Sequence, residues 1–467
     1  MDPTDPVPTP QLTGITLIIG LFCIAGAVGL LGLWLACVSH REEERVATGR
    51  ALWLALLGPL PFLLTALLPL PAPVGWILIG VTLGLPMVLL WPTGTPRGFA
   101  AGDPNGRIDE RTVMFSRAAL EPGTERFEAY YQEFPGHQAP DDHFRSLAGL
   151  MSPRAGKFEP VSFAAAAGTF DTVEVLAQLI QGQPHTPRVD LTPAAATRFV
   201  KGWTLKMGAL DCGITALKAE HLYSVKGRGE TYGQAIDLDH PHAIAFTVEM
   251  EADTLGTAPE GPTLMESSQQ YLNAGRIAVQ LAAGLRRMGW EAEAHIDANY
   301  KVVCPLVARD AGLGEIGRMG LLMTPRLGPR VRLAVVTTTL PLEHDRSGHD
   351  PSVLHFCSLC KKCADICPVE AIPDGPRPDQ RWQIDSEACF SYWCAVGTDC
   401  GQCMRVCPYS HPDSLLHNGV RWGLRRSTLF RHVALRLDDL LYGRRPAPRP
   451  VPPWLPERSA RVVEKQQ

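Results

Sequence analysis

Four cysteines near residue 360 stand at a spacing that can hold iron. The run FCSLCKKCADICP separates Cys357, Cys360 and Cys363 by two residues each and ends on Cys367, which a proline follows. A C-x2-C-x2-C-x3-C-P run is typical of chains that wrap a cubane iron–sulfur cluster. The spacing therefore predicts redox chemistry in this stretch.

A second run repeats that ending. CGQCMRVCP carries Cys400 and Cys403, and then Cys407 before a proline. A fourth thiolate must come from upstream, and Cys389, separated from Cys400 by ten residues, is the simplest choice. Cys394 lies closer in the sequence and is the alternative.

The two runs together predict two 4Fe–4S clusters. In such modules three closely spaced cysteines hold one cluster, and the cysteine before the proline ligates the other. We expect the first cluster on Cys357, Cys360, Cys363 and Cys407. We expect the second on Cys389, Cys400, Cys403 and Cys367. Disulfides and structural zinc fit less well, because no oxidising-compartment signal is present and zinc needs only four ligands.

Composition limits the other functions. The chain has 467 residues, of which 45% are hydrophobic, and this is enough for two or three domains with a buried core. Its formal net charge of −4 argues against a nucleic-acid partner, which requires a basic face. The remaining cysteines are scattered and are expected to be buried free thiols. They are Cys23, Cys37, Cys212, Cys304 and Cys394.

The first 92 residues are expected to form a membrane anchor. Residues 14–38 carry no charge and are long enough to span a bilayer. The apolar block 51–91 is too long for one helix and is interrupted at PLPAPVG, so we divide it into spans at about 51–69 and 75–91. A cleaved signal peptide is the alternative for the first span, but a basic n-region and a small-residue cleavage site are missing.

Arginines predict the orientation of this anchor. Arg41, Arg45 and Arg50 lie in the first loop and Arg97 follows the third span, whereas the N-terminus and the 69–75 turn carry no positive charge. The positive-inside rule places the N-terminus outside and everything after residue 92 in the cytoplasm, in a multi-pass protein of the inner membrane. No twin-arginine signal precedes the first span, which agrees with this orientation. The spans contain no histidine, so a membrane haem is not expected and a plain anchor is favoured.

The middle of the chain alternates helix and strand patterns. Residues 95–185 show no motif, but a Thr-Pro helix start at 192 opens a clearer region. A helix is expected from about 263 to 288, and strands are expected at 212–217, 242–251, 291–296 and 331–340. The irregular alternation predicts an α+β or α/β core. The Arg- and Pro-rich tail after Arg444 is expected to be disordered or wrapped on the surface.

A glycine-rich segment precedes the last strand. Gly312, Gly314 and Gly317 spell G-x-G-x-x-G, but neither an apolar strand before them nor an acidic residue about twenty positions later supports a dinucleotide site. Glycines at these positions instead allow the backbone to approach a flat or bulky ligand closely.

The order of these motifs resembles a known family. NYKVVCPLVARDAGLGEIGRMGLLMTPRLGPRVRLAVVTT, then FCSLCKKCADICP and a C-x10-C-x2-C-x3-C-P run, is similar to the reductive dehalogenases, corrinoid and iron–sulfur enzymes that remove halide from organohalides. The similarity covers roughly residues 190–415. Epoxyqueuosine reductases share the general plan and are the nearest competing family.

The resemblance implies a domain plan. It predicts an α/β, nitroreductase-like core at 93–345 that holds a base-off cobalamin, then a bacterial-ferredoxin-like module with two clusters at 346–415. A C-terminal extension at 416–467 follows, its tail disordered. The corrinoid contacts would come from the glycine-rich segment. They are Gly312, Gly314, Gly317 and Gly320.

The resemblance also implies catalytic residues. The proton-donating tyrosine falls on Tyr271, its basic partner on Arg332, and an asparagine on the substrate or corrinoid side on Asn299. Arg330 is the rival of Arg332, because it lies two residues away on the same expected strand face. A guanidinium beside the phenol stabilises the phenolate and lowers its pKa. His295 is close to this site, but we expect it to be a solvated residue at a strand end.

These expectations combine into a membrane-anchored reductive dehalogenase. An organohalide, with a slight preference for an aryl halide, would accept electrons from an external donor such as a ferredoxin, a flavodoxin or a quinol-linked protein. Aromatic walls would suit such a substrate. The candidates for them are Trp203, Trp290, Trp382 and Trp393. The alternatives are a membrane-bound electron-transfer subunit without a substrate of its own and an epoxyqueuosine-reductase-like corrinoid enzyme.

Overall fold

The computed structural model describes residues 9–99, 102, 106–346, 349–377 and 381–456, with the backbone alone for 9–13. The chain forms two compact units. Unit 1 comprises residues up to Thr95 together with Trp422–Pro446, and unit 2 comprises Pro96–Arg421 with the residues from Ala447 onward.

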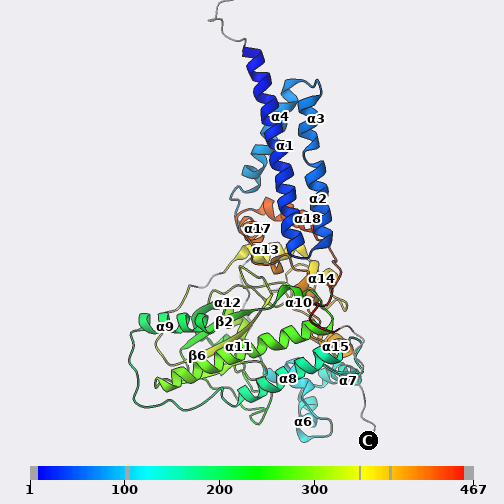
Figure 1. Ribbon diagram of the computed structural model, residues 1–467. Helices are drawn as coiled ribbons and strands as arrows, with labels where there is room; N and C mark the ends of the chain where they lie inside the picture. Colours follow the sequence, from blue (N-terminus) through cyan, green and yellow to red (C-terminus); the bar gives the residue numbers. More distant parts are fainter. Residues whose placement is uncertain (1–8, 100–101, 103–105, 347–348, 378–380, 457–467) are drawn as a thin grey trace, which may run out of the picture. The chain divides into compact units, whose positions relative to one another are not determined.

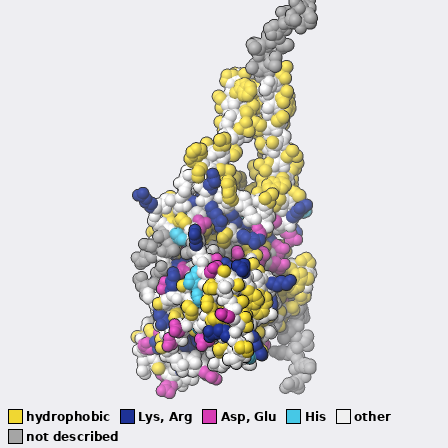
Figure 2. Space-filling view, turned by 90° about the vertical axis from the view of Figure 1, so that its left-hand side faces the viewer, with side chains coloured by type: hydrophobic (Ala, Val, Ile, Leu, Met, Phe, Trp, Pro, Cys, Tyr) yellow, Lys and Arg dark blue, Asp and Glu magenta, His cyan; other side chains and the backbone are white. Residues whose placement is uncertain are grey.

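Unit 1 contains three helical segments that are long and apolar enough to cross a membrane, at Gly14–Arg41, Arg45–Leu67 and Ala72–Leu89. They lie side by side in Figure 1, and Figure 2 shows hydrophobic side chains along their sides. The four helices that build them are α1 (Thr9–Arg41), α2 (Arg45–Leu57), α3 (Leu60–Leu67) and α4 (Ala72–Leu89). The expected number of apolar segments is therefore confirmed.

The limits of the second and third segments differ from the expected ones. The second begins at Arg45 instead of 51, because the polar residues after Arg45 already form helix α2. The third begins at Ala72 instead of 75, because a proline is tolerated in the first turn of a helix. Close packing holds α1 against α2: a Cβ added at Gly32 would lie 2.6 Å from the Cα of Ala55. Small residues at such contacts are typical of membrane helices.

Two helices near the C-terminus were not expected from the sequence. They are α17 (Leu415–Arg426) and α18 (Thr428–Leu441), and Ser427 caps α18 by accepting a hydrogen bond from the Phe430 amide. The part from Trp422 to Pro446 packs with the apolar helices of unit 1. Of the two expectations for the tail, residues 447–456 agree with a segment wrapped on the surface and not with disorder, since the Arg449 amide donates to the carbonyl of Gly256 at 2.8 Å. The last eleven residues lie outside the described part.

Unit 2 is built on a four-stranded sheet with the order β1-β2-β6-β3. Each neighbouring pair is antiparallel. The core is therefore α+β, and the α/β assignment was wrong, because hydrophobic periodicity does not determine strand direction. The strands are β1 (Asp211–Ala216), β2 (His242–Glu249), β3 (Ala292–His295) and β6 (Val331–Thr338), close to the four ranges expected from the sequence.

The two faces of this sheet carry different helices. On one face, Phe246 of β2 and Val336 of β6 pack against Ile277 of the long helix α11 (Gly261–Arg287), which runs along the sheet in Figure 1. On the other face, Val335 packs against Val307 of α12 (Cys304–Asp310). Even-numbered residues of β6 therefore face α11.

The remaining elements surround this core. A small hairpin pairs β4 (Glu315–Ile316) with β5 (Leu322–Met323). The helices between residues 110 and 206 are η1 (Glu110–Thr112), α5 (Met114–Ala118), α6 (Glu125–Glu133), η2 (Pro135–His137), α7 (Gln138–Ser146), α8 (Pro160–Ala177) and α9 (Pro193–Lys206). Two short helices complete this part: η3 (Ala219–His221) follows β1, and α10 (Ala252–Leu255) lies between β2 and α11. The cysteine-rich region contains α13 (Pro351–Cys360), α14 (Lys362–Ile366), α15 (Ser386–Val396), α16 (Gln402–Arg405) and η5 (Pro408–Ser410).

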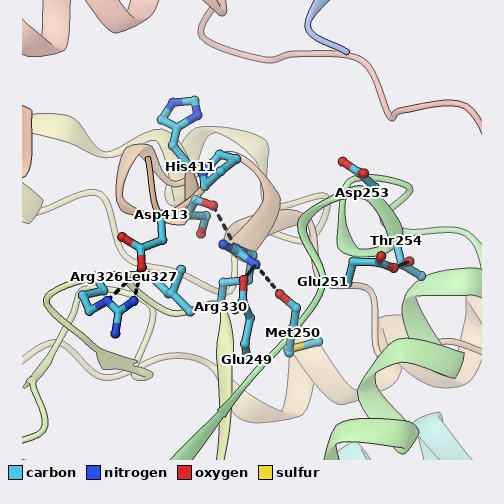
Figure 3. Close-up of polar contacts among 12 residues, drawn as sticks. Glu249, Met250, Glu251, Asp253, Thr254, Arg326, Leu327, Arg330, His411 and Asp413 are labelled. Carbon is cyan, nitrogen blue, oxygen red and sulfur yellow. Dashed lines mark hydrogen bonds and ion pairs between the residues drawn. The ribbon is translucent and has the colours of Figure 1, made fainter. Parts of the chain in front are cut away.

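Arg330 connects the core to the cysteine-rich region. Its side chain is 2% exposed; Nε donates to the Ser410 carbonyl at 3.0 Å, and Nη1 donates to Glu249 and to the Met250 carbonyl. Figure 3 shows this contact beside the more exposed pair of Arg326 and Asp413. Arg330 precedes β6, where the chain turns, so the alternation of strand faces does not extend to it.

We predict that Arg330→Met lowers the stability of the detergent-solubilised chain by about 1–3 kcal/mol for each buried carbonyl acceptor left without a donor. Arg326→Met, the matched control, removes a pair whose arginine is 51% exposed and is expected to cost about 1 kcal/mol or less. Thermal unfolding of the two variants checks this. Equal midpoints would contradict the structural role of Arg330.

Candidate functional site

A cavity of about 510 Å³ in unit 2 is lined by several of the candidate residues. Phe115, Phe170 and Trp393 supply aromatic walls. Tyr271 and Arg332 also line it. The cavity therefore combines an apolar surface with a few polar groups, as small-molecule sites do.

Tyr271 and Arg332 contact each other in the wall of this cavity. Tyr271 lies on α11 and Arg332 on the α11-facing side of β6, so the packing of helix on sheet brings them together. The guanidinium carbon of Arg332 lies 4.8 Å from the centre of the Tyr271 ring. This cation–π contact leaves a charged group beside the phenol.

Arg332 is held by two further residues that the sequence analysis missed. Its Nη2 donates to Ser267 Oγ, and to Asp399 Oδ2 at 3.1 Å. The side chains of Arg332 and Asp399 are 12% and 9% exposed. Ser267 stands four residues before Tyr271, on the same helix face, which is a signal that could have been used. Asp399 directly precedes Cys400, but nothing in the sequence pairs it with a strand residue.

Two buried atoms of this group have no hydrogen-bond partner among the described residues. They are Nε of Arg332 and Oδ1 of Asp399. Leaving such groups unpaired is costly unless a ligand or water satisfies them. The cavity is therefore suited to a molecule that presents polar atoms at this point.

The electrostatics of Tyr271 differ from the expectation. The Arg332 guanidinium lowers the pKa of the phenol, but burial and the carboxylates of Asp297 and Asp399 raise it, and the pKa of Tyr271 is raised to about 12. The expected lowering by Arg332 is present but is outweighed. The phenol consequently keeps its proton at neutral pH.

A second polar group lines the cavity. Nη2 of Arg228 donates to the Tyr300 hydroxyl at 2.6 Å, and the Tyr300 ring stacks on Tyr223 at 5.6 Å between ring centres. The fully buried carboxylate of Glu110 receives the Gly227 amide at 2.8 Å and lies 3.5 Å from Arg228. These contacts hold this part of the cavity wall in place. No motif in the sequence predicted them.

Asn299 and His295 do not lie as expected. Asn299 closes a turn with Ile296 through paired backbone hydrogen bonds, and its side chain donates to the Asp297 carbonyl, so it is not among the residues that line the cavity. His295 lines the cavity but is fully buried, not solvated. Its Nδ1 accepts from the Lys301 amide at 3.2 Å, and Nε2 then donates to Thr337 at 3.0 Å. Burial lowers the pKa of His295 to about 4, so the ring is neutral.

Only one of the four candidate tryptophans lines the cavity, namely Trp393. Trp203 and Trp290 pack in the core between α11 and the sheet, and Trp382 lies against the guanidinium of Arg318 at 4.5 Å. The prediction was therefore wrong for three of the four tryptophans, because large apolar side chains occur both in cores and in cavity walls.

The glycine-rich segment builds the hairpin of β4 and β5. A Cβ at Gly314 would lie 2.3 Å from the Met323 carbonyl oxygen, and one at Gly317 would lie 2.7 Å from Cγ of Met323. Gly312 and Gly320 have φ angles of +82° and +74°, which favour glycine. The chain's own packing thus accounts for these glycines, and their contact with a corrinoid stays a prediction.

The cysteines fall into two groups of neighbours. Burial raises the pKa of Cys407 well above its ordinary value, and the nearby thiols of Cys357, Cys360 and Cys363 raise it further. Arg318, which is 1% exposed, donates to the Cys357 carbonyl at 3.0 Å and lies beside the same thiols. A buried cation among thiols favours thiolates, which are the form that binds iron.

Cys389 belongs to the second group. Burial raises its pKa to about 12, and the neighbouring thiols of Cys400 and Cys367 add to this. Burial raises the pKa of Cys403 well above its ordinary value, and the thiols of Cys400, Cys363, Cys389 and Cys367 raise it further. Burial alone raises the pKa of Cys394, which packs in an apolar cluster with Met114, Phe144 and Phe390.

These neighbours match the two predicted ligand sets except that Cys363 also lies near Cys403, and the assignment of ligands to two clusters stays a prediction. No three His, Cys, Asp or Glu side chains within the described ranges converge closely enough to hold a single metal ion. Ligands of a larger inorganic cluster stand further apart than those of one ion. Bound iron would deprotonate these thiols regardless of their burial.

Comparison with known proteins agrees with this picture. The 4Fe-4S dicluster domain family matches residues 356–411. Tetrachloroethene reductive dehalogenase of Sulfurospirillum multivorans is 33% identical over 214 residues, which are 43% of this chain and 42% of that protein. A tetrachloroethene reductive dehalogenase of Desulfitobacterium hafniense is 34% identical over 211 residues, 42% of this chain and 38% of that protein.

The structure of a catabolic reductive dehalogenase in complex with 3-bromo-4-hydroxybenzoic acid superposes with a TM-score of 0.61 at 24% identity. The superposition covers 77% of this chain and 49% of that one. The chain has the reductive dehalogenase fold. Reductive dehalogenases are thus its relatives in sequence and in fold, and the predicted resemblance is confirmed. The chain spans about half the length of these relatives or less.

Epoxyqueuosine reductases are also related, but over a shorter stretch. The enzyme of Synechococcus sp. is 28% identical over 152 residues, 27% of this chain and 44% of that protein. The similarity to reductive dehalogenases is longer and higher in identity.

Proposed function

We propose that this chain is a membrane-anchored reductive dehalogenase that replaces a halogen of an organohalide by hydrogen. The observation that carries the proposal is the contact of Tyr271 with Arg332 in an apolar cavity, one of whose lining residues, Asp399, directly precedes Cys400. The reaction consumes two electrons and one proton and releases halide. Sequence similarity to reductive dehalogenases supports this over a simple electron carrier.

The cofactors follow from the donor groups. Cys357, Cys360, Cys363 and Cys407 would hold one 4Fe–4S cluster, and Cys367, Cys389, Cys400 and Cys403 the other. A cobalamin bound at the cavity would supply two-electron reducing power at cobalt, and the clusters would deliver the electrons from an external donor protein. The unpaired polar atoms of Arg332 and Asp399 fit a cavity that takes up a ligand.

The chain's own residues would supply the proton and the geometry. Tyr271 keeps its phenolic proton at neutral pH and presents it to the cavity. Arg332 stabilises the phenolate that remains after proton transfer, and Ser267 and Asp399 hold the guanidinium in place. The walls of Phe115, Phe170 and Trp393 exclude water and favour an aryl halide.

Metal content tests the proposal. The full chain, produced in a host supplied with cobalamin, should contain about eight irons and about one cobalt. With reduced methyl viologen and a bromophenol it should release bromide. Eight irons without cobalt and without halide release would instead favour a membrane-bound electron carrier.

The anchor is proposed to leave the catalytic part in the cytoplasm. The ends of α1 and α4 and the start of α2 lie at one end of unit 1, where Arg41, Arg45 and Arg50 gather, whereas the turn between α3 and α4 has no basic residue. We predict that alkaline phosphatase fused after Leu70 is active and that a fusion after Glu43 is inactive. The reverse pattern in whole cells would contradict this orientation.

A further inference from the structure

Helix α18 carries an exposed apolar stripe. Leu429, Leu437 and Leu440 are 43%, 48% and 52% exposed. With the half-buried Val433 they stand at positions i, i+4, i+8 and i+11, which share one face of a helix. The buried residues Arg431 and Leu435 lie on the opposite side. The stripe is therefore not part of the core.

This helix is attached to one end of the apolar helices of unit 1. Arg50 of α2 donates to the Leu440 carbonyl at 2.8 Å, and the Thr428 amide donates to Thr93 at 2.8 Å, just after α4. Arg431 Nη2 adds a hydrogen bond to Thr95 at 2.9 Å. Figure 1 shows α18 beside the lower ends of α1 and α2. These contacts fix α18 where all three apolar segments meet the polar chain.

The segment Trp422–Pro446 is strongly basic. It contains only two acidic residues, Asp438 and Asp439. Its six arginines are Arg425, Arg426, Arg431, Arg436, Arg444 and Arg445. Trp422 is exposed and stacks with the guanidinium of Arg426, and the exposed Trp91 lies two residues after the end of α4. Tryptophan and arginine at this level are typical of the headgroup region of a bilayer.

We propose that α18 is an interfacial helix that inserts its leucine stripe into the lipid surface and binds anionic headgroups through the exposed arginines on it and before it, Arg425, Arg426 and Arg436. The proposal rests on the proposed membrane anchoring. Lipid is the occupant, because the stripe belongs to the same unit as the apolar segments and lies at their end, and because the excess of arginine complements anionic headgroups.

Photocrosslinking in lipid nanodiscs tests the proposal. Benzoylphenylalanine is placed at Leu437 in the full chain, at Leu83 of α4 as a positive control, and at Leu205 of unit 2 as a matched exposed leucine. After irradiation, mass spectrometry identifies the adducts. We expect lipid adducts at Leu437 and Leu83 and none at Leu205. The yield at Leu437 should rise severalfold when phosphatidylglycerol is added to phosphatidylcholine.

The outcomes separate this inference from the anchor itself. Lipid adducts at Leu83 but not at Leu437 would overturn the interfacial role of α18 and leave the anchor intact. Adducts of Leu437 with peptides of the same chain or of a second copy would identify a protein contact instead and also overturn it. A yield that does not respond to phosphatidylglycerol would overturn the role of the arginines. The absence of adducts at Leu83 would contradict the membrane anchor.

Discussion

Replacing Tyr271 with phenylalanine is expected to lower turnover by a factor of about 10² to 10⁴, the range in which positioned proton donors act. Phenylalanine keeps a ring for Arg332, whose guanidinium carbon now lies 4.8 Å from the ring centre, and removes only the proton. Iron and cobalt contents should not change, because none of the eight predicted cluster cysteines is among the described residues that line the cavity with Tyr271. Halide release and metal content, measured on one preparation, check both halves of the prediction.

Tyr130→Phe is the matched control. Tyr130 is also buried, and its hydroxyl lies 2.8 Å from His137 Nδ1, outside the cavity. This variant should keep wild-type turnover. Activity near wild type in Tyr271→Phe would remove Tyr271 from the mechanism. The pKa of about 12 also predicts a pH dependence. The phenol of Tyr271 is protonated below that value, so raising the pH from 7 to 9 should not remove the proton donor.

Cys389→Ala is expected to have a comparably large effect. Cys389 has Cys400 and Cys367 as neighbouring thiols, and its removal leaves one proposed cluster with three ligands. Iron should fall from about eight to about four atoms per chain, and electron delivery to the cavity should stop. Iron analysis and electron paramagnetic resonance of the reduced protein measure the loss.

Cys394→Ala separates the two candidates for this ligand. Cys394 packs with Met114, Phe144 and Phe390, so its replacement should cost some stability but no iron. Loss of a cluster in the Cys394 variant alone would exchange the roles of the two residues. The choice that spacing left open would then be decided against Cys389.

Much of the redox part of the chain could be predicted from spacing alone. Cysteines that bind a cluster recur at fixed intervals, so both cysteine runs can be recognised in the sequence. The long helix and the four strands were also predictable, because each has a clear apolar period. Tyr271 and Arg332 required the family resemblance, since a helix residue and a strand residue carry no common pattern.

Other features depend on contacts that no local pattern encodes. Arg330 was expected beside Arg332, but a turn at Pro329 rotates its side chain toward Ser410 and Met250. Asn299 was expected in the site, but its backbone closes a turn. Phe115 and Phe170 come from a region without motifs and reach the cavity only through tertiary packing.

The position of Asp399 has a consequence for protein engineering. Asp399, whose carboxylate holds Arg332, directly precedes Cys400, a proposed cluster ligand, so a substitution at Asp399 would change the cavity and the proposed path of electrons together. Phe115 on α5 and Phe170 on α8 line the same cavity from helices without cysteines. For the proposed dehalogenase, attempts to change the range of substrates should therefore begin at these two phenylalanines.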